Sequence, residues 1–504
     1  MPMKKTVFVF LFFLSVHFSM GQKVYVDSLC RQAYGRILAL HFGPAAQMLN
    51  QEKARHPDNV YVDYLENYMD FLRVFIGENQ NIFDELDDAF NTRYLRIKQL
   101  PDTSRYKNLL LANMNLQWAF ARLKFGEYFS AAWELNRAYR MLTENAEQFP
   151  GFVPNYISMG VMHVMIGLVP DKYNWMLKII SMQGSVEQGK AEIYKALDQA
   201  AMHPAYAYLY PEALFYLGFI ELNLSPGKKA LERLMGYLQK TGNGNLLMDF
   251  LKTDIYMRHG QNDMALKQLS LAPQGKGYFP FYYLQYLRGE CYLRKLEPGR
   301  ADTCFKSFLK HFEGLNYIKD AWRKRAWAAL LQNQPKLYHH FMDSVVTHGT
   351  ARVGADQEAE KEALSNKPPC KGLLRARLLF DGGYYHRAKT VLDTMDTTRL
   401  TGGEKTERIY RYARIAHRQN LMAQAKAAYR KTLELGSSSP RYFAANAALK
   451  LGEIYESEDS LSLARTYYRQ CLHLDFNEYV NSIRGKAKEA LERISEKQQA
   501  TTGN

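Results

Sequence analysis

A recurring pattern of side-chain size constrains the fold of this chain more than any other feature. A small residue is followed twelve positions later by a second small residue, and four positions after that by a bulky one, as in Gly452, Ala464 and Tyr468. Small side chains let two antiparallel helices approach closely, and a bulky side chain one turn further on fills the space beside them. Copies of the pattern begin at Ala33, Ala119, Gly218, Thr253 (a degenerate copy), Gly289, Ala376, Ala413 and Gly452. A repeat of this kind predicts stacked helix pairs.

The spacing of the copies supports the same fold. The second small residue recurs at steps of 35 and 36 residues from Ala230 to Ala301, and of 37 and 39 residues from Ala388 to Ala464. Turn residues such as Gly382-Gly383 fall where a helix should end. A chain of 504 residues is too long for one ordinary core, and alternating strand patterns are scarce. The chain is therefore predicted to be an all-α repeat array.

Two copies show which family the pattern resembles. They are LGEIYESEDSLSLARTYYRQCL, from Leu451 to Leu472, and RGECYLRKLEPGRADTCFKSFL, from Arg288 to Leu309. The period of about 34 residues and the order of small and bulky positions resemble tetratricopeptide repeats (TPRs). The family's Trp position is not matched in these copies, and its closing Pro is clear only at Pro57. The resemblance implies a TPR-like α-solenoid, a right-handed superhelix of antiparallel helix pairs whose first helices line a concave groove.

A second resemblance lies in residues 149–197. Gly160, the run from Gly167 to Pro170, an apolar stretch with Trp, and then Gly184 and Gly189 are similar to a glycine and Leu-Pro pattern in the eukaryotic family of Iml2 and tetratricopeptide repeat protein 39. The relatives in that family are non-enzymatic adaptors, so this resemblance implies no catalytic residue. Their cytosolic setting conflicts with the amino-terminal segment of this chain, and their roles are not carried over.

That amino-terminal segment predicts export. Two lysines precede an apolar run of twelve residues from Val7 to Phe18, and Ser19-Met20-Gly21 supplies small side chains for a signal peptidase. Twelve apolar residues are too few to span a bilayer as a helix, so a signal peptide cleaved after Gly21 is predicted rather than a membrane anchor. No Cys lies at the cleavage point, which disfavours a lipid anchor. Removing two lysines lowers the net charge from +15 to +13. We predict an exported, periplasmic bacterial protein, with association with the outer membrane left open.

The repeats divide the mature chain into two predicted blocks. Residues 22–348 form an amino-terminal block, 349–368 a polar linker, 369–494 a carboxy-terminal block of three repeats, and 495–504 a disordered tail. TPR-like pairs in the first block are expected near 26–59, 112–145, 211–244, 246–279 and 282–315, with irregular helix pairs between them.

Motifs of catalysis and metal binding are missing from the sequence. His339, His340 and Asp343 come nearest to a metal site, but adjacent residues on a helix point about 100° apart. His163 lies in an apolar stretch and is expected to be a core histidine with a partner. Phosphate loops and nucleophile elbows are not found. The chain is therefore predicted to be non-enzymatic, with no catalytic residue, no metal site and no cofactor.

The cysteines leave one pairing open. Five cysteines in 504 residues cannot make a disulfide framework. Cys291 and Cys304 fall on the two expected helices of one pair, so they are either bridged in an oxidising compartment or two buried thiols. Cys30, Cys370 and Cys471 are expected to be unpaired.

Basic residues supply the candidate binding site. Four arginines, the first at residue 408, recur at intervals of three, three and four along one expected helix, which places them on one face. By the TPR resemblance, three of them face the groove, with a basic residue at a comparable place one repeat to either side. Guanidinium groups bind carboxylates and phosphates in a bidentate manner, whereas the alternative is a solvated helix face. The candidate partner-binding residues are Arg377, Arg411, Arg414, Arg418 and Lys450.

Two function classes follow from the sequence. The first is a protein-interaction scaffold of the cell envelope that binds a partner protein or an acidic peptide in the concave groove. The alternative is a glycan- or anionic-ligand-binding component associated with the outer membrane, whose partner could be envelope lipid or glycan. That alternative favours a Cys after the signal peptide and an exposed Trp platform, and neither is evident. Export disfavours nucleic acid despite a pI of about 9.3, and the oligomeric state is open.

Overall fold

The computed structural model describes residues 21–169, 182–224, 228–242, 244–273 and 275–502. The predicted signal peptide, apart from Gly21, and the Trp-containing part of the glycine-rich segment lie outside these residues. The chain divides into two compact units: unit 1 comprises residues 1–220 and 274–279, and unit 2 comprises residues 221–273 and 280–504. The predicted boundary at 348 therefore lies inside unit 2. In the described part of the chain, every helix is too short or too polar to cross a bilayer.

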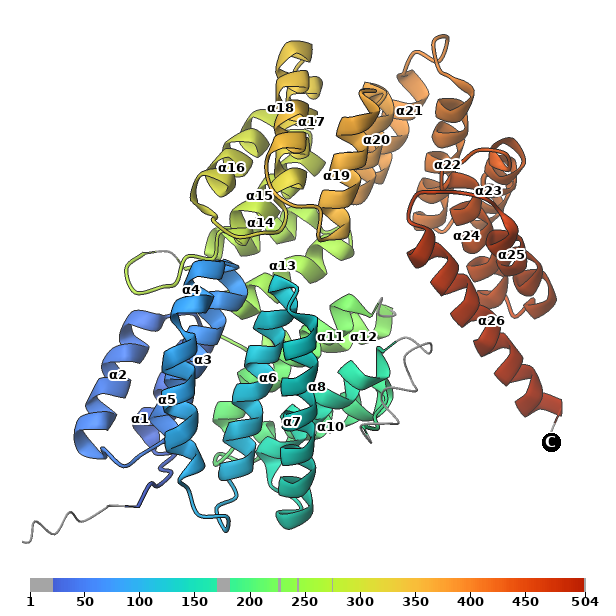
Figure 1. Cartoon of the computed structure of the whole chain (residues 1–504). Coiled ribbons are helices and arrows are strands. Elements are labelled where there is room, and N and C mark those ends of the chain that lie inside the picture. Colours follow the sequence, from blue (N-terminus) through green and yellow to red (C-terminus); the bar gives the residue numbers. More distant parts are fainter. Residues whose placement is uncertain (1–20, 170–181, 225–227, 243, 274, 503–504) are drawn as a thin grey trace, which may run out of the picture. The chain divides into compact units, whose positions relative to one another are not determined.

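The described residues form helices joined by turns and loops, and their β-structure is limited to an isolated bridge between Lys23 and Asn59 (Figure 1). Unit 1 contains α1 (Ser28–Leu38), α2 (Phe42–Arg55), α3 (Tyr61–Gly77), α4 (Gln80–Glu85), α5 (Asp87–Lys98), α6 (Lys107–Phe125), α7 (Tyr128–Gln148), α8 (Val153–Gly167), α10 (Val186–Met202) and η2 (Ala207–Leu209). The boundary at residue 220 falls within α11 (Tyr210–Asn223).

Unit 2 continues with the same type of helix pair. It contains α12 (Lys228–Gln239), α13 (Leu246–Arg258), α14 (Asn262–Leu271), α15 (Tyr283–Arg294), α16 (Pro298–His311), α17 (Ile318–Leu331), α18 (Pro335–Thr347), α19 (Gly354–Ser365), α20 (Lys371–Asp381), α21 (Tyr385–Thr394), α22 (Gly402–Arg418), α23 (Met422–Gly436), α24 (Phe443–Ser457), α25 (Leu461–His473) and α26 (Val480–Thr502). The all-α, TPR-like solenoid predicted from the sequence is confirmed.

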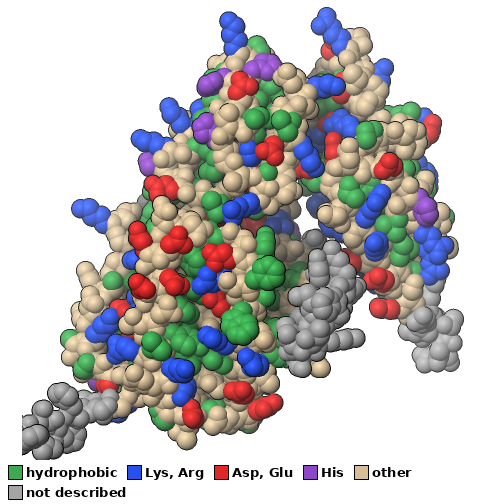
Figure 2. Space-filling model, viewed as in Figure 1, with side chains coloured by type: hydrophobic (Ala, Val, Ile, Leu, Met, Phe, Trp, Pro, Cys, Tyr) green, Lys and Arg blue, Asp and Glu red, His purple; other side chains and the backbone are tan. Residues whose placement is uncertain are grey.

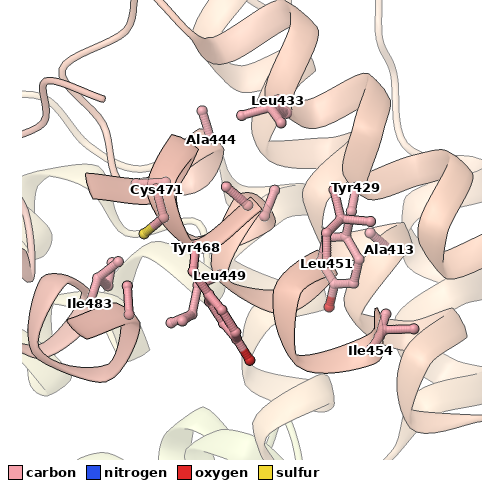
Figure 3. Packing of buried hydrophobic residues seen from close by; sticks show 14 of the residues in the cluster. Ala413, Tyr429, Leu433, Ala444, Leu449, Leu451, Ile454, Tyr468, Cys471 and Ile483 are labelled. Carbon is pink, nitrogen blue, oxygen red and sulfur yellow. The ribbon is translucent and has the colours of Figure 1, made fainter. Parts of the chain in front are cut away.

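The small and bulky positions of the repeat meet inside each pair. A Cβ atom on Gly452 of α24 would lie 2.5 Å from Cε1 of Tyr468 on α25, and one on Gly289 of α15 would lie 2.8 Å from the Phe305 ring on α16. Tyr468 and Phe305 are fully buried. Figure 3 shows how Tyr468 and its neighbours fill the core of the last repeats. Because the bulky ring occupies the space of the missing side chain, the pattern fixes the distance between the helices of a pair.

The glycine-rich segment that resembles the Iml2 family packs more closely still. A Cβ atom on Gly160 of α8 would lie 2.6 Å from the carbonyl oxygen of Gly189 on α10, and one on Gly167 would lie 2.5 Å from the Val186 nitrogen. Gly184 faces the Cα atom of His163 in the same way, at 2.8 Å. These contacts are with backbone atoms, so α8 and α10 touch backbone to backbone, and this contact explains why the segment needs glycine.

Segment 349–368, predicted as a linker, is instead part of unit 2. It contains α19, which packs against α17 and α18. Asp356 is fully buried and accepts hydrogen bonds from the backbone nitrogens of Tyr317 (2.7 Å) and Asp320 (2.9 Å) at the start of α17. The segment is polar because its carboxylate caps a neighbouring helix. Likewise, α26 continues to Thr502 where a disordered tail from 495 was predicted.

Two turns that are distant in the sequence touch within unit 2. Gly260, between α13 and α14, lies against Gly383, between α20 and α21, and both have positive φ angles, 69° and 84°. A Cβ atom on Gly383 would overlap the carbonyl oxygen of Gly260. Beside them the Tyr384 hydroxyl donates to Asp263 (3.0 Å) and accepts from the Asn262 amide (3.2 Å). The array therefore turns back on itself between these pairs.

Candidate functional site

A pocket of about 320 Å³ lies next to this contact between turns, inside unit 2. Its walls come from α13, α15, α20, α21 and α22, so four repeats and the turn at Gly260 contribute to it. It is lined by Asp254, Met257, Arg258, Gly260, Arg294, Phe380, Asp381, Tyr385, Arg414 and Arg418. Four guanidinium groups thus face two carboxylates.

The charged residues of the pocket occupy two equivalent positions of the repeat, one and five places after the first small residue. These two places are one helical turn apart on the first helix of each pair. The residues at the two places are Asp254 and Arg258 on α13, Glu290 and Arg294 on α15, Arg377 and Asp381 on α20, and Arg414 and Arg418 on α22. Only the last of these pairs consists of two basic residues.

The three mixed pairs neutralise themselves. Arg258 Nε lies 2.9 Å from an oxygen of Asp254, Arg294 Nη2 lies 3.3 Å from an oxygen of Glu290, and Arg377 Nε lies 3.8 Å from an oxygen of Asp381. Each is an ion pair between residues four apart on one helix. The charge of these arginines is therefore largely compensated before any ligand enters.

Arg414 and Arg418 lack such a partner on their own helix. Arg414 stacks over the Phe380 ring at 4.1 Å, and its nearest carboxylate oxygen, on Asp381, is 4.0 Å away. Asp381 is shared with Arg377. Arg418 is exposed and makes no ion pair or hydrogen bond with the described residues. The pocket therefore carries a net positive charge that the chain itself does not neutralise.

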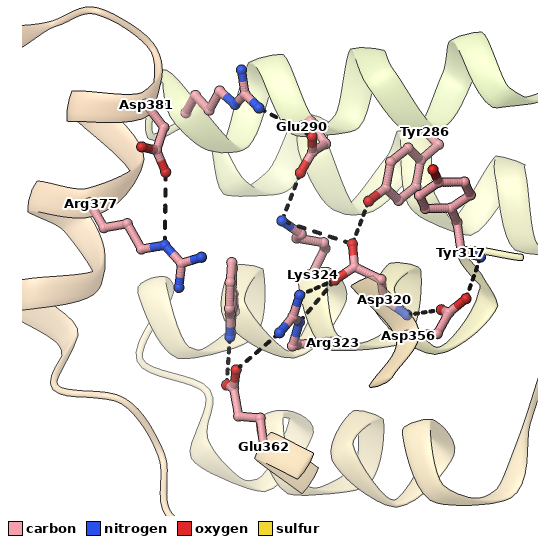
Figure 4. A network of polar contacts seen from close by, with 12 residues as sticks. Tyr286, Glu290, Tyr317, Asp320, Arg323, Lys324, Asp356, Glu362, Arg377 and Asp381 are labelled. Atoms are coloured by element: carbon pink, nitrogen blue, oxygen red, sulfur yellow. Dashed lines mark hydrogen bonds and ion pairs between the residues drawn. The ribbon is translucent and has the colours of Figure 1, made fainter. Parts of the chain in front are cut away.

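A buried network ties α15, which carries Arg294 of the pocket, to α17 (Figure 4). Glu290 accepts a hydrogen bond from Lys324 (2.7 Å), and Asp320 accepts from Arg323 (2.9 Å, through Nε) and from the Tyr286 hydroxyl. Burial opposes the ionisation of both carboxyls, yet the neighbouring cations lower the pKa of Glu290 and of Asp320 below their ordinary values. Both acids are therefore charged at neutral pH, and they fix the cations around them.

The five predicted site residues lie in different surroundings, and only some of them line the pocket. Arg414 and Arg418 line the pocket, and Arg377 adjoins it through Asp381. Arg411 is buried and forms an ion pair with Glu407, one turn earlier on α22. Lys450 pairs with Glu453 at 2.6 Å. The pocket thus contains part of the predicted stripe, and the other members are held by acids of the chain.

Sequence reasoning missed Arg258 and Arg294, which complete the pocket from earlier repeats. Both stand five places after the first small residue, as Arg418 does. That shared position is visible in the sequence. What the sequence does not show is that the turn after α13, at Gly260, touches the turn after α20, at Gly383.

The other candidates have structural roles. His163 is buried and its Nδ1 lies 2.7 Å from Glu192, which confirms it as a core histidine with a partner. All five cysteines are free thiols, so Cys291 and Cys304 are not bridged.

In the described residues, one set of donors resembles a metal site: single ligand atoms of Asp27, Cys30 and Glu52 lie within 4.8 Å of one another. The Asn59 amide donates to Glu52 (2.8 Å) and to the Cys30 sulfur (3.7 Å). The Asn59 amide therefore already contacts two of the three residues, Glu52 and Cys30.

No protein-family model matches the chain, and no curated protein sequence matches it. Solved structures similar to it include the TPR domain of P58(IPK) (14% identity, 84% of this chain and 97% of that chain, TM-score 0.22). A human IFIT1 dimer with PPP-AAAA is 14% identical, over 89% of this chain and 95% of that chain, with a TM-score of 0.29. Yeast Tom70 is 12% identical, over 94% of this chain and 98% of that chain, with a TM-score of 0.23. At these identities and TM-scores none of the three bears on function.

Proposed function

We propose that the protein is a non-enzymatic interaction scaffold that holds an acidic segment of a partner protein in the arginine-lined pocket of unit 2. The observation that carries the proposal is the pair Arg414 and Arg418. Equivalent positions in three other repeats hold an acid and a base that pair with each other. On α22 both positions are basic, and Arg418 is left without a partner among the described residues.

The chemistry of the pocket fits a carboxylate ligand. A guanidinium group offers a planar fork of donors that matches a carboxylate, and Arg414 is held in orientation by its stacking on Phe380. A volume of 320 Å³ is at the lower end of small-ligand sites, about 300–1,000 Å³. It suits one acidic side chain or a terminal carboxylate with its flanking residue.

The test is the affinity of a fluorescein-labelled oligoglutamate peptide, measured by fluorescence anisotropy, for the mature chain and for an Arg414→Glu/Arg418→Glu variant. We expect the double variant to bind at least about tenfold more weakly, a loss of roughly 1.4 kcal/mol or more. An oligolysine peptide should not bind the wild-type pocket.

A matched control separates the pocket from the general basic charge of unit 2. Arg375 and Arg399 are exposed residues of unit 2 outside the pocket, so Arg375→Glu/Arg399→Glu changes the net charge by the same amount. This control should retain most of the affinity. Equal losses in the two variants would show that the peptide senses net charge alone, and the proposed pocket would be wrong.

We also propose that the scaffold acts in a bacterial cell envelope after export. The support is the segment of residues 1–21, with its two lysines, twelve-residue apolar run and small residues before Gln22. Mass spectrometry of the exported protein should identify Gln22 as its first residue. An intact amino terminus on protein recovered from the cytosol would contradict this localisation.

A further inference from the structure

Three aromatic side chains at the start of α7 in unit 1 are largely exposed. Phe129 is 95% exposed, Tyr128 is 68% exposed and Trp133 is 66% exposed. None of them makes a ring or cation–π contact with the described residues. Large aromatic side chains dominate the energetics of interfaces when they are buried, and a group of them left in water marks an interaction surface.

These rings are not needed to hold α7 in place. The face of α7 that packs against the rest of unit 1 carries Ala131, Ala138 and Leu142, which are fully buried. Phe129 and Trp133 are four residues apart, so they lie next to each other on the opposite side of the helix. At its start, α7 thus carries apolar side chains on its exposed side as well as on its buried side.

Acidic side chains border the aromatic group. Asp84, Glu85, Asp87 and Asp88 are exposed at the junction of α4 and α5. The junction is tied to the start of α7 through one guanidinium group, because Arg122 pairs with Asp87 (3.6 Å) and also with Glu127, the residue before Tyr128. Figure 2 shows acidic and hydrophobic side chains gathered on this face of unit 1.

The acidic border is not neutralised from within. Arg122 is shared among Asp87, Glu127 and Glu134. Glu85 and Asp88 have no ion pair or hydrogen bond with the described residues. The face therefore offers exposed aromatic rings beside uncompensated negative charge.

We infer that this face of α7, with its acidic border on α4 and α5, docks an amphipathic helix of a partner protein that carries Lys or Arg next to large apolar side chains. Apolar side chains cover the rings, and the cations of the same helix reach the carboxylates of the border or stack on the rings. An acidic partner or an anionic membrane is repelled by the four carboxylates, and a neutral glycan would leave them without a role. The inference does not rest on the pocket of unit 2, whose ligand has the opposite charge.

The test uses two synthetic peptides of about 18 residues, roughly five helical turns, built from Leu and Lys or from Leu and Glu with the same apolar face. Isothermal titration calorimetry with the full mature chain measures the affinity of each. We expect the Leu/Lys peptide to bind and the Leu/Glu peptide to bind at least about tenfold more weakly. Equal affinities would overturn the inference.

Variants locate the binding face. Phe129→Ser/Trp133→Ser should lower the affinity for the Leu/Lys peptide at least about tenfold. Glu85→Lys/Asp88→Lys should also lower the affinity for the Leu/Lys peptide, and it should raise the affinity for the Leu/Glu peptide. Met202→Ser, at a residue of α10 that is 71% exposed, is the matched control and should bind as the wild type does. Unchanged binding in the first two variants would overturn the inference. So would binding of cellohexaose or of phosphatidylcholine vesicles that depends on Phe129 and Trp133, because the face would then belong to a glycan or a membrane.

Discussion

The two units share the pattern of small and bulky residues that packs their helix pairs, but they differ in the residues next to the small positions. One place after the first small residue, α1 has Tyr34 and α6 has Phe120, whereas the helices of the pocket have Asp254, Glu290 or Arg414. Tyr34 is buried against Tyr68. The small and bulky positions fix how the helices of a pair approach, and the residues next to them decide whether the inner surface is aromatic or charged. The fold and the binding chemistry are thus encoded at different positions of one repeat.

The same contrast appears in the net charge. Residues 22–220 and 274–279 of unit 1 carry 20 Lys and Arg against 21 Asp and Glu, whereas unit 2 carries 44 against 30. The basic excess of residues 22–504 therefore belongs to unit 2 alone. Since long-range electrostatic attraction follows local rather than total charge, acidic partners should be drawn to one unit and not to the other.

Buried acids also differ between the units. Glu212 in unit 1 has no cation beside it among the described residues: burial raises its pKa, and the Tyr68 hydroxyl donates to it at 2.9 Å. In unit 2, Glu290 and Asp320 are surrounded by Lys and Arg, and their pKa values are lowered. A buried acid without a cation favours its neutral form, and one with cations holds its charge.

We expect the largest difference in stability between the units from substitutions of the glycines at the contacts between helices. Gly189 on α10 faces the Gly160 carbonyl oxygen, a backbone atom, whereas Gly452 on α24 faces the Tyr468 side chain. Gly189→Ala should cost about 3 kcal/mol of unfolding free energy because two helix backbones must separate. Gly452→Ala should cost only about 1 kcal/mol, since a ring can shift and alanine favours the helix. Urea unfolding monitored by circular dichroism measures both.

The control for this pair is Gly236→Ala, because a Cβ atom at Gly236 meets nothing within 4 Å. It should leave stability unchanged or raise it slightly. If Gly452→Ala proves as costly as Gly189→Ala, the two units do not differ in how tightly their helix pairs pack.

A second effect concerns how helices are capped in the two units. Asp27 caps α1 locally by accepting from the Cys30 nitrogen at 2.8 Å, whereas Asp356 on α19 caps α17 from a different helix and is fully buried. Asp27→Ala should cost about 1 kcal/mol. Asp356→Ala should cost about 2 kcal/mol, because it removes the acceptor of two backbone nitrogens, one buried and one partly buried. Thermal unfolding of both variants measures the difference, and equal losses would mean that α19 does not support α17.

A third and smaller effect is the response to pH. Burial raises the pKa of Asp63 and Glu134 in unit 1 to about 6, and that of Asp249 and Asp356 in unit 2 likewise to about 6. A carboxyl with a raised pKa binds its proton more tightly in the folded chain. It therefore stabilises the fold below its ordinary pKa, and this contribution is lost as the pH rises through about 6. Both units should gain some stability, about 1–2 kcal/mol, between pH 7 and pH 4.5.

Below pH 4.5 the stabilities of the two units should respond differently to a further fall in pH. Among the described residues, the buried acids whose pKa is lowered lie in unit 2: Glu290, Asp320 and Glu407, each beside buried cations. Their stabilising contribution is present above the ordinary pKa of a carboxyl and is lost as the pH falls through the lowered one. Hydrogen exchange followed by mass spectrometry should show α15, α17 and α22 losing protection before α3 and α6. Simultaneous loss would contradict the contrast between the buried acids.

The fold could be predicted from the sequence because its main determinant is local. Gly289 and Phe305, sixteen residues apart, lie on helices that must pack together, so side-chain size alone predicts their contact. The contact of Gly260 with Gly383 depends on the curvature accumulated over the intervening pairs, which no single spacing encodes. For the same reason the burial of Asp356 was missed: its partners, the nitrogens of Tyr317 and Asp320, come from another helix.

The candidate site was predicted only in part. The stripe on α22 was visible, but Arg411 and Arg414 differ in their surroundings although they are three residues apart. Glu407 lies one turn before Arg411 and pairs with it, whereas Arg414 has Tyr410 one turn before it. Spacing alone identifies the face of a helix, and the acid four residues away decides whether an arginine on that face is available to a ligand.

The smallest change in stability is expected at the docking face of unit 1, because its aromatic side chains are exposed rather than packed within the unit. Phe129→Ser/Trp133→Ser should change the unfolding free energy by less than about 0.5 kcal/mol, because both side chains are mostly exposed and the buried face of α7 is untouched. Thermal unfolding of the variant beside the wild type measures this change. A loss above about 1.5 kcal/mol would show that the two rings pack within unit 1. In that case their exposure would not mark a surface for a partner, and the contrast between an aromatic unit 1 and a charged unit 2 would be one of packing alone.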